Sequence, residues 1–417
     1  MTTTALMTDK YEYTMLQATL EDGTAYKQSV FEAFTRRLPA GREYGVVAGL
    51  ERILEAVENF TFDEETLAYL AEEGLNETTI KYLRNFKFTG TINAYPEGEF
   101  YFPGSPLVQI IAPFGEAVLL ETLILSILNY DCSVASAASR MVQASDSAAL
   151  VELGGRRAHE KAAVAAARAA YIAGFAGTSN LEAGKKYGVP VYGTSAHAFT
   201  LAHADELTAF KTQVKSLGTD TTLLVDTYDI PQGIRNAVEA GGKSLGAIRI
   251  DSGDIREETI KARALLDSLG ATKTKIVVSG DLDEYELTKL QGAPVDIAGV
   301  GTRVVTGSGH PTASMVYKLV AIEDAPGQWR NVEKKSENKA STGGKKNVLR
   351  EAGKLYAQEP CAADNASVHN TTEYEIPAAK GAAYSPFATV FKNGKRLDGT
   401  TLDKTREMHQ KLVSYIK

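Results

Sequence analysis

The chain has 417 residues, of which 44% are hydrophobic and 23% charged, and a formal net charge of −7. This length predicts about two domains, and the composition is typical of a globular protein with a large core rather than a disordered one. The acidic balance argues against a general nucleic-acid-binding protein, because such proteins present a basic face to the phosphates.

The two cysteines, Cys132 and Cys361, are far apart in the sequence. They exclude a disulfide framework and a cysteine-rich zinc site, and they suit a reducing compartment. Residues 1–14 show neither the basic start nor the apolar core of a signal peptide. The most apolar stretch, residues 106–128, is interrupted by a proline and two glutamates and indicates a strand followed by a buried helix rather than a membrane span. We therefore expect a cytoplasmic protein.

Residues 1–140 mix two kinds of pattern. Helices are predicted over residues 8–22, 45–60 and 63–74, and strands over residues 29–38, 88–98 and 106–112.

Between about residues 150 and 301 the chain alternates between short β-branched runs and longer helical patterns. Strands are predicted at 149–155, 189–195, 221–227, 245–253, 274–280 and 295–301, and helices at 158–175, 181–188, 198–218, 231–242, 255–270 and 283–292. This alternation predicts a parallel sheet buried on both faces. Both an open doubly wound sheet and a barrel are compatible with it. The first turn, ELGGRRAHE, lacks the G-x-G-x-x-G pattern, and no central reversal is seen, which favours a barrel, complete or incomplete.

The chain continues with a predicted strand at residues 316–320. Residues 333–350 are polar and contain glycine, and we expect an exposed loop or hairpin because burying their charges would be costly. The lysines there indicate a solvated surface rather than an anion site.

In parallel α/β folds, ligands bind at the carboxyl ends of the strands. The first strand end offers Glu152 and then two arginines after two glycines, Arg156 and Arg157. Guanidinium groups hold phosphate or carboxylate in bidentate fashion, although a surface ion pair is the competing interpretation.

The next strand ends are also polar. Thr194, Ser195 and His197 follow one strand, and Asp226, Tyr228 and Asp229 follow the next. Without further information, a buried histidine bonded to a neighbouring backbone group is the competing interpretation of His197.

A third polar end carries Arg249 and Asp251, which are two residues apart in a strand and should share a face. The default role of Asp254, Asp281 and Asp283 is to cap the helices that follow.

Two glycine-containing turns complete the predicted edge, VVSGD at residues 277–281 and GVGTRVVTGSG at residues 299–309. Backbone N–H groups and a hydroxyl in such turns cradle a phosphate. With the arginines, they suggest a phosphorylated sugar as ligand, with acidic residues holding ribose hydroxyls or Mg²⁺. No His and carboxylate cluster indicates a tight metal site.

The chain resembles the nicotinate phosphoribosyltransferase family. An ordered set of segments carries the resemblance: TDKYEYTM, FEAFTRRLP, ELGGRRAHE, GFAGTSN, GTSAHAF, LLVDTYD, IRIDSGD, VVSGDLDE and GVGTRVVTG. It implies an irregular, incomplete α/β barrel at residues 141–330, packed on an α/β sandwich formed by residues 1–140 and completed by residues 331–417. It also implies a homodimer with sites near the subunit interface.

The implied reaction converts nicotinate, phosphoribosyl diphosphate, ATP and water to nicotinate mononucleotide, diphosphate, ADP and phosphate, with Mg²⁺. The resemblance implies that ATP phosphorylates His197.

The resemblance also assigns roles to the other candidates. It implies that Tyr11, Thr194 and Arg249 contact nicotinate, and that Arg156 faces the diphosphate. It implies that Thr302 holds the 5′-phosphate, with Gly280 and Gly301 as backbone donors. Ser195 and Asp251 belong to the same predicted site, Ser195 as a substrate contact and Asp251 as a catalytic group.

Some family members carry a zinc-binding cysteine cluster, which two cysteines cannot supply, so no structural metal is expected. Three alternatives remain: a nicotinamide-specific phosphoribosyltransferase, a sugar-phosphate lyase or aldolase, and a ligand-binding barrel without activity. The cationic Arg249 favours nicotinate over the neutral amide. A lyase would need a lysine or base at a strand end, and no predicted strand end supplies a lysine.

Overall fold

The computed structural model describes residues 3–335, 342–363, 376–397 and 399–416. The chain forms two compact units: unit 1 comprises residues 1–133 and 312–417, and unit 2 comprises residues 134–311. The expected boundaries were 140 and 330, whereas residues 315–325 form a strand of unit 1. The division into independently folding domains stays a prediction.

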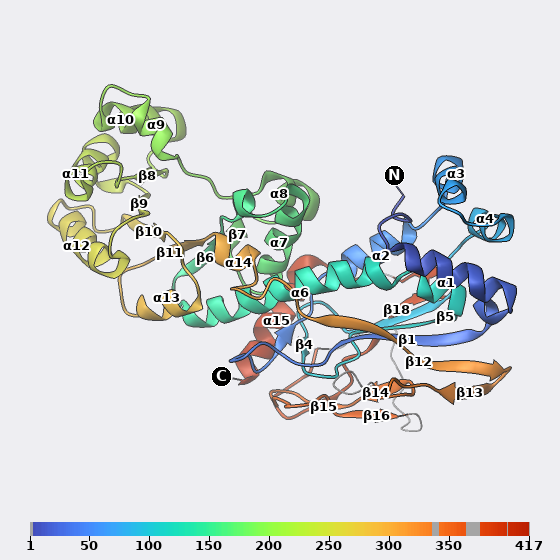
Figure 1. Cartoon of the computed structure of the whole chain (residues 1–417). Coiled ribbons are helices and arrows are strands. Elements are labelled where there is room, and N and C mark those ends of the chain that lie inside the picture. The colour runs from blue at the N-terminus through green and yellow to red at the C-terminus, as the bar shows by residue number, and fades with distance from the viewer. Residues whose placement is uncertain (1–2, 336–341, 364–375, 398, 417) are drawn as a thin grey trace. The chain divides into compact units, whose positions relative to one another are not determined.

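Unit 1 is built on a seven-stranded sheet whose strands come from both ends of the chain (Figure 1). Every pairing in it is antiparallel. Its order is β13 (Gln328–Asn331), β12 (Met315–Ala325), β1 (Gln28–Thr35), β5 (Val108–Pro113), β3 (Thr91–Ala94), β18 (Ala388–Lys392) and β19 (Lys395–Arg396). The four strands predicted at residues 29–38, 88–98, 106–112 and 316–320 are thus confirmed.

Helices of unit 1 begin where polar residues cap them. Asp63 and Asn76 accept hydrogen bonds from the backbone N–H groups of Thr66 and Thr79, which fixes the starts of two short helices. The helices are α1 (Lys10–Glu21), α2 (Leu50–Glu58), α3 (Glu64–Glu72), α4 (Glu77–Arg84), α5 (Phe114–Val118) and α15 (Leu402–Ile416), with the 3₁₀ turn η1 (Thr24–Tyr26).

The apolar stretch at residues 106–128 becomes β5, α5 and the first part of α6 (Glu121–Ala144), as predicted. In the described part of the chain, no helix is both long and apolar enough to cross a membrane.

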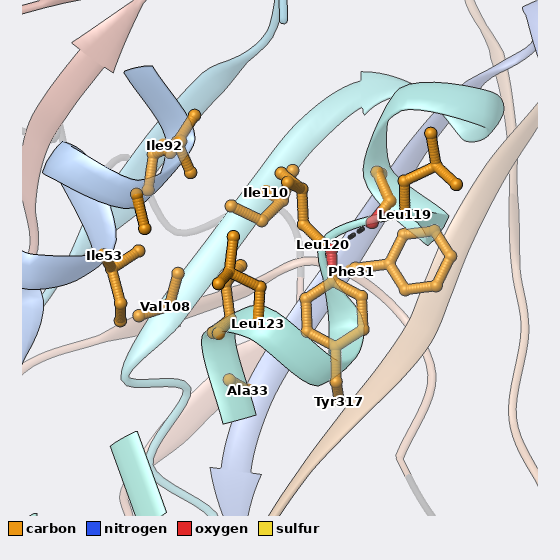
Figure 2. Close-up of a cluster of buried hydrophobic side chains, with 14 of the residues drawn as sticks. Phe31, Ala33, Ile53, Ile92, Val108, Ile110, Leu119, Leu120, Leu123 and Tyr317 are labelled. Atoms are coloured by element: carbon orange, nitrogen blue, oxygen red, sulfur yellow. Dashed lines mark hydrogen bonds between the residues drawn. The ribbon is translucent and has the colours of Figure 1, made fainter. Parts of the chain in front are cut away.

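One face of the large sheet carries the hydrophobic core of unit 1. Phe31 and Tyr317, on neighbouring strands, stack with ring centroids 4.9 Å apart. Leu119, Leu120 and Leu123 lie against the same cluster (Figure 2). The hydroxyl of Tyr317 donates to the Ala117 carbonyl at 2.8 Å, so the one polar atom on this ring is satisfied.

The opposite face of the sheet carries a buried row of hydrogen-bonded polar side chains, because alternate residues of a strand point to opposite faces. Gln109 donates to Glu32 at 3.0 Å, Asn93 donates to Gln109 at 3.1 Å, and Thr389 donates to Asn93 at 2.9 Å. Lys346 closes the row with a 2.7 Å ion pair to Glu32.

The expectation of an exposed segment at residues 333–350 is wrong for Lys346 and Arg350. Both are buried, with Arg350 only 2% exposed. Their charges are tolerated because Lys346 pairs with Glu32, and Arg350 pairs with Glu99 and Glu359. Residues 336–341 of this segment lie outside the described residues.

Three two-stranded sheets complete unit 1. They pair β2 (Gly45–Val46) with β4 (Phe100–Tyr101), β14 (Lys346–Val348) with β16 (Cys361–Ala363), and β15 (Arg350–Glu351) with β17 (Ala383–Tyr384).

Unit 2 contains a six-stranded parallel sheet (Figure 1). Its order is β7 (Gly177–Thr178), β6 (Ala149–Glu152), β11 (Ile297–Val300), β10 (Lys275–Ser279), β9 (Ala247–Ile250) and β8 (Thr222–Leu224). The first long strand, β6, pairs with the last, β11, which happens in a barrel and not in a doubly wound sheet. Residues 134–311 are all described, and within them no ladder joins β7 to β8. The barrel is therefore incomplete, as predicted.

The helices of unit 2 follow the strands in alternation. They are α7 (Glu160–Ile172), α8 (Leu181–Tyr187), α9 (His197–Leu201), α10 (Glu206–Leu217), α11 (Ile230–Gly241), α12 (Ile255–Ser268), α13 (Glu284–Lys289) and α14 (Thr302–Val305), with 3₁₀ turns η2 (Gly155–Arg157) and η3 (Gly242–Ser244).

Two predicted elements of unit 2 differ from the structure. Residues 189–195 contain one isolated bridge, Thr178 to Val191, instead of a strand. The helix expected over residues 198–218 is split into α9 and α10, because Asp205 accepts the backbone N–H of Thr208 and starts a new helix there.

Candidate active site

The parallel strands of unit 2 end at one edge of the sheet, and the polar residues predicted there come from its neighbouring strands. Glu152, Asp226, Asp251, Gly280 and Gly301 end or follow β6, β8, β9, β10 and β11. Two of the three expected caps are found, because Asp254 and Asp283 accept backbone N–H groups at the starts of α12 and α13. The expectation is wrong for Asp281, which lies two residues before the cap of α13 with a φ of +44°.

His197 is the first residue of α9, and its side chain is 42% exposed. Its Nδ1 lies 3.2 Å from Thr227 Oγ1, and its Nε2 lies 3.8 Å from Asp226 Oδ1. The imidazole thus contacts side chains rather than the backbone group of the competing interpretation. It is accessible and has a carboxylate on one nitrogen and a hydroxyl on the other.

Asp226 is held rigidly beneath His197, with only 1% of its side chain exposed. Its Oδ2 accepts the backbone N–H of Asp251 at 2.9 Å and the hydroxyl of Ser252 at 2.7 Å. Its Oδ1 is buried and has no hydrogen-bond partner within the described residues. The sequence placed Asp226 at a strand end, among the acidic residues expected to hold ribose hydroxyls or Mg²⁺, but it did not predict the contact with His197.

Arg249 is the centre of a second group. Its Nε donates to Ser279 Oγ at 2.8 Å, its Nη1 to Thr194 Oγ1 at 3.0 Å and its Nη2 to Asp251 Oδ1 at 3.2 Å. The hydroxyl of Ser279 also hydrogen-bonds Asp251 Oδ1. The expectation that Arg249 and Asp251 share a face is confirmed, whereas Ser279 was not among the predicted site residues.

Further buried polar atoms belong to residues 195–206, which include His197. Thr200 Oγ1, Glu206 Oε1 and Ser195 Oγ are buried without a hydrogen-bond partner in the described residues. Burial, followed by the nearby charges of Asp226 and Asp229, raises the pKa of Glu206. The surroundings of Asp226 therefore already contain much negative charge.

The arginine-containing turn is fixed by Glu152, which is fully buried. Its carboxyl accepts the hydroxyl of Thr178 at 2.5 Å and the backbone N–H of Gly154. Burial raises the pKa of Glu152. A Cβ on Gly154 would lie 2.7 Å from the Gly301 carbonyl oxygen, so only glycine permits this approach of the two turns.

Arg156 and Arg157 lie in η2, exposed, at this same turn. Thr302 begins α14 next to Gly301, and α14 contacts η2. Gly280 has a φ of +115°, and a Cβ there would lie 2.9 Å from the Asp251 carbonyl oxygen. The predicted phosphate turn at residues 299–309 therefore lies beside the arginine turn, and the one at residues 277–281 lies beside Asp251.

Tyr11 belongs to unit 1, at the start of α1, and is 44% exposed. Partial burial of the ring and the nearby Glu121 carboxylate raise the pKa of Tyr11 to about 12. Its predicted contact with nicotinate stays a prediction. Across the described residues, no group of three or more His, Cys, Asp or Glu side chains is arranged to hold a metal ion.

Comparison with known proteins identifies the chain's relatives. The N-terminal domain model of nicotinate phosphoribosyltransferase matches residues 6–129, and the family model of the same enzyme matches residues 148–378. The nicotinate phosphoribosyltransferase pncB1 of Mycobacterium tuberculosis is 57% identical over 353 residues, which is 83% of this chain and 78% of that protein. The nicotinate phosphoribosyltransferase of Bacillus subtilis is 43% identical over 358 residues, covering 83% and 73%.

Solved structures share the fold. The human nicotinic acid phosphoribosyltransferase superposes with a TM-score of 0.78 at 24% identity, covering 99% of this chain and 94% of that one. The nicotinate-nucleotide pyrophosphorylase of Pyrococcus furiosus gives 0.79 at 23% identity, covering 98% and 95%. From the matched family models and the identity to these relatives, the chain belongs to the nicotinate phosphoribosyltransferase family.

Proposed function

We propose that the chain makes nicotinate mononucleotide from nicotinate and phosphoribosyl diphosphate, and that ATP drives this reaction through phosphorylation of His197. The observation that carries the proposal is the position of His197, exposed and set between the Asp226 carboxylate and the Thr227 hydroxyl. A nicotinamide-specific enzyme is the alternative, and the Arg249 cation favours the acid.

The phosphoryl step needs a free imidazole lone pair. The Asp226 carboxylate, 3.8 Å from Nε2, favours the tautomer with its proton on Nε2, which leaves the Nδ1 lone pair as nucleophile. Nδ1 attacks the γ-phosphorus of ATP, and the bond from that phosphorus to the bridging oxygen breaks, so that ADP leaves. Water later attacks the same phosphorus, releasing phosphate and returning the electron pair to Nδ1. Such transfers depend mostly on positioning and charge neutralisation.

The phosphoribosyl step needs no general base. The pyridine nitrogen of nicotinate attacks the anomeric carbon with its own lone pair as the carbon–oxygen bond to diphosphate breaks. Arg249 would pair with the nicotinate carboxylate, and Arg156 with the leaving diphosphate, whose charge grows in the transition state. Thr302, with the backbone of Gly301 and Gly280, would hold phosphate oxygens of the sugar.

Mg²⁺ fits the donors present. The buried Oδ1 of Asp226 is an acceptor without a hydrogen-bond partner among the described residues, and Mg²⁺ prefers such oxygen ligands together with substrate phosphates. Asp226 would hold the ion from the protein side, and the ion when bound would neutralise phosphate charge.

A homodimer in which Tyr11 reaches nicotinate is part of the same proposal. Tyr11 presents a half-exposed aromatic ring at the start of α1, and this ring suits stacking on a pyridine. Light scattering of the chain tests the oligomeric state, and the KM for nicotinate in the Tyr11→Ala variant tests the role of the ring.

The deciding experiment follows label from γ-labelled ATP into the protein, with His197→Asn as the test variant. His159→Asn is the matched control, because the exposed His159 caps α7, a role that asparagine also fills. We expect the control to incorporate label and His197→Asn to incorporate none. Label in His197→Asn together with continued ATP stimulation would refute the proposal, and product from nicotinamide but not from nicotinate would favour the alternative.

A further inference from the structure

Ser279 occupies a position between two charged groups of the candidate site. It is the last residue of β10 and only 4% exposed. Its oxygen accepts from Arg249 Nε at 2.8 Å, and its hydroxyl also hydrogen-bonds Asp251 Oδ1. Because a serine hydroxyl has a single hydrogen, and arginine Nε can only donate, that hydrogen is directed to Asp251. The orientation of Ser279 is thus determined.

The partners of Arg249 leave a defined set of donors for a ligand. A guanidinium group has five N–H donors. Ser279 takes the Nε donor, Thr194 takes one on Nη1, and Asp251 takes one on Nη2. One N–H therefore stays available on each terminal nitrogen.

Two donors on adjacent nitrogens match the two oxygens of a carboxylate. An amide offers one oxygen and one NH₂ group, and the latter would place a donor against a donor. Asp251 partly compensates the charge of Arg249, so the arrangement of donors, more than net charge, distinguishes the acid from the amide.

Of the three partners, Ser279 is the one fixed by regular sheet pairing. Val277 and Val278 of β10 pair with Arg249 and Ile250 of β9, which brings Ser279 level with Asp251. Thr194, by contrast, lies in the stretch at residues 192–196 that has no regular structure. Rigid elements hold a functional group more precisely than loops do.

We propose that Ser279 is a positioning residue that holds Arg249 so that its two remaining terminal donors receive the nicotinate carboxylate, and that it thereby contributes to the preference for nicotinate over nicotinamide. This proposal rests on the proposed role of Arg249 in binding nicotinate. Ser279 itself does not touch the reacting atoms.

The test compares Ser279→Ala with Ser279→Thr. The alanine variant loses both hydrogen bonds, and the threonine variant keeps the hydroxyl. Steady-state KM and kcat are measured for nicotinate, nicotinamide and phosphoribosyl diphosphate, with thermal unfolding as the folding control.

For Ser279→Ala we expect the KM for nicotinate to rise about tenfold, the size expected for losing a hydrogen bond to a charged group. The KM for phosphoribosyl diphosphate and the phosphorylation of His197 should be unchanged, and the ratio of kcat/KM for nicotinate to that for nicotinamide should fall. Ser279→Thr should restore the nicotinate KM. An unchanged nicotinate KM in Ser279→Ala overturns the proposal, and so does an equal rise in both KM values.

Direct binding separates this proposal from the proposed function. Calorimetric titration of nicotinate into the wild type and both variants measures recognition without turnover. If the wild type binds nicotinate but forms no phosphoenzyme, the ATP coupling fails while Ser279 is still tested. If Ser279→Ala is unfolded, the test uses the folded Ser279→Thr variant alone. Nicotinate binding by this variant that is as strong as in the wild type supports the requirement for the hydroxyl, and weaker binding overturns the proposal.

Discussion

The Nε2 nitrogen of His197 faces the Oδ1 oxygen of Asp226 across 3.8 Å. The other oxygen of Asp226 is fixed by the backbone N–H of Asp251 and by Ser252, so the carboxylate cannot rotate away without breaking two hydrogen bonds. Because Asp251 also contacts Arg249, one strand end connects the histidine with the arginine group. The proposed phosphoryl acceptor and the proposed nicotinate contact therefore share a support.

Replacing Asp226 with asparagine should impair phosphorylation of His197. The asparagine oxygen would take the place of Oδ2, and its NH₂ group would then face Nε2 and favour the tautomer with the proton on Nδ1. In a catalytic triad the corresponding change lowers the rate about 10⁴-fold. The measurement is the initial rate of label transfer from γ-labelled ATP to the protein.

Asp229→Asn is the control for this substitution. Asp229 lies three residues later and caps α11 by accepting the backbone N–H of Gln232, and asparagine is an equally good cap. We expect its phosphorylation rate to stay near that of the wild type. Equal rates in Asp226→Asn and the wild type would show that the carboxylate does not orient the imidazole.

Thr302→Val should weaken binding of phosphoribosyl diphosphate. The hydroxyl of Thr302 lies at the start of α14 next to Gly301, where the proposal places the 5′-phosphate. Losing a hydrogen bond to a charged group raises KM by roughly 10- to 100-fold. Thr306→Val is the matched control, since the Thr306 hydroxyl donates to the Thr302 carbonyl within the same turn. Similar KM values in the two variants would argue against this role for Thr302.

The sequence predicted the parallel sheet and its polar edge well, because both depend on local patterns. Strand–helix alternation gives the sheet, and residues two apart, such as Arg249 and Asp251, share a face whatever the rest of the chain does. It could not predict Ser279, whose importance comes from the register of β10 against β9. It also could not predict that Arg350 is buried, because Glu99 lies 251 residues away and no local pattern indicates that pairing.

Arg350→Met should strongly destabilise the protein. Arg350 and its partners Glu99 and Glu359 are almost fully buried, and removing the cation leaves two carboxylates close together without it. Breaking a buried ion pair in this way costs about 3–5 kcal/mol of the free energy of unfolding. The free energy of unfolding is measured by urea unfolding, followed by tyrosine fluorescence.

The matched surface variant is Arg330→Met. Arg330 pairs with Asp324, and both side chains are about half exposed. An exposed pair contributes about 1 kcal/mol or less, so this variant should unfold close to the wild type. If the free energy of unfolding falls no more in Arg350→Met than in Arg330→Met, Glu99 and Glu359 must take up protons when the cation is removed.

His409 should make stability depend on pH. It lies buried on α15, with its Nδ1 2.8 Å from the Gly98 carbonyl oxygen, and burial lowers its pKa to about 4. The unfolded chain binds this proton near pH 6.5, whereas the folded chain binds it only near pH 4. The stabilisation from neutral His409 is therefore present above pH 6.5 and is lost as the pH falls toward 4. Between pH 7 and pH 5 the loss is about 2 kcal/mol.

Other groups act in the opposite direction over part of this range. Burial raises the pKa of Glu12, Glu116 and Glu152, so these carboxyls favour folding as the pH falls. The contribution of His409 is therefore isolated by comparison with His409→Gln, whose amide can donate to the same carbonyl but does not titrate. From pH 7 to pH 5, we expect the unfolding free energy of the wild type to fall by about 2 kcal/mol relative to that of the variant. A pH-independent difference would mean that His409 is protonated equally in the folded and unfolded chains.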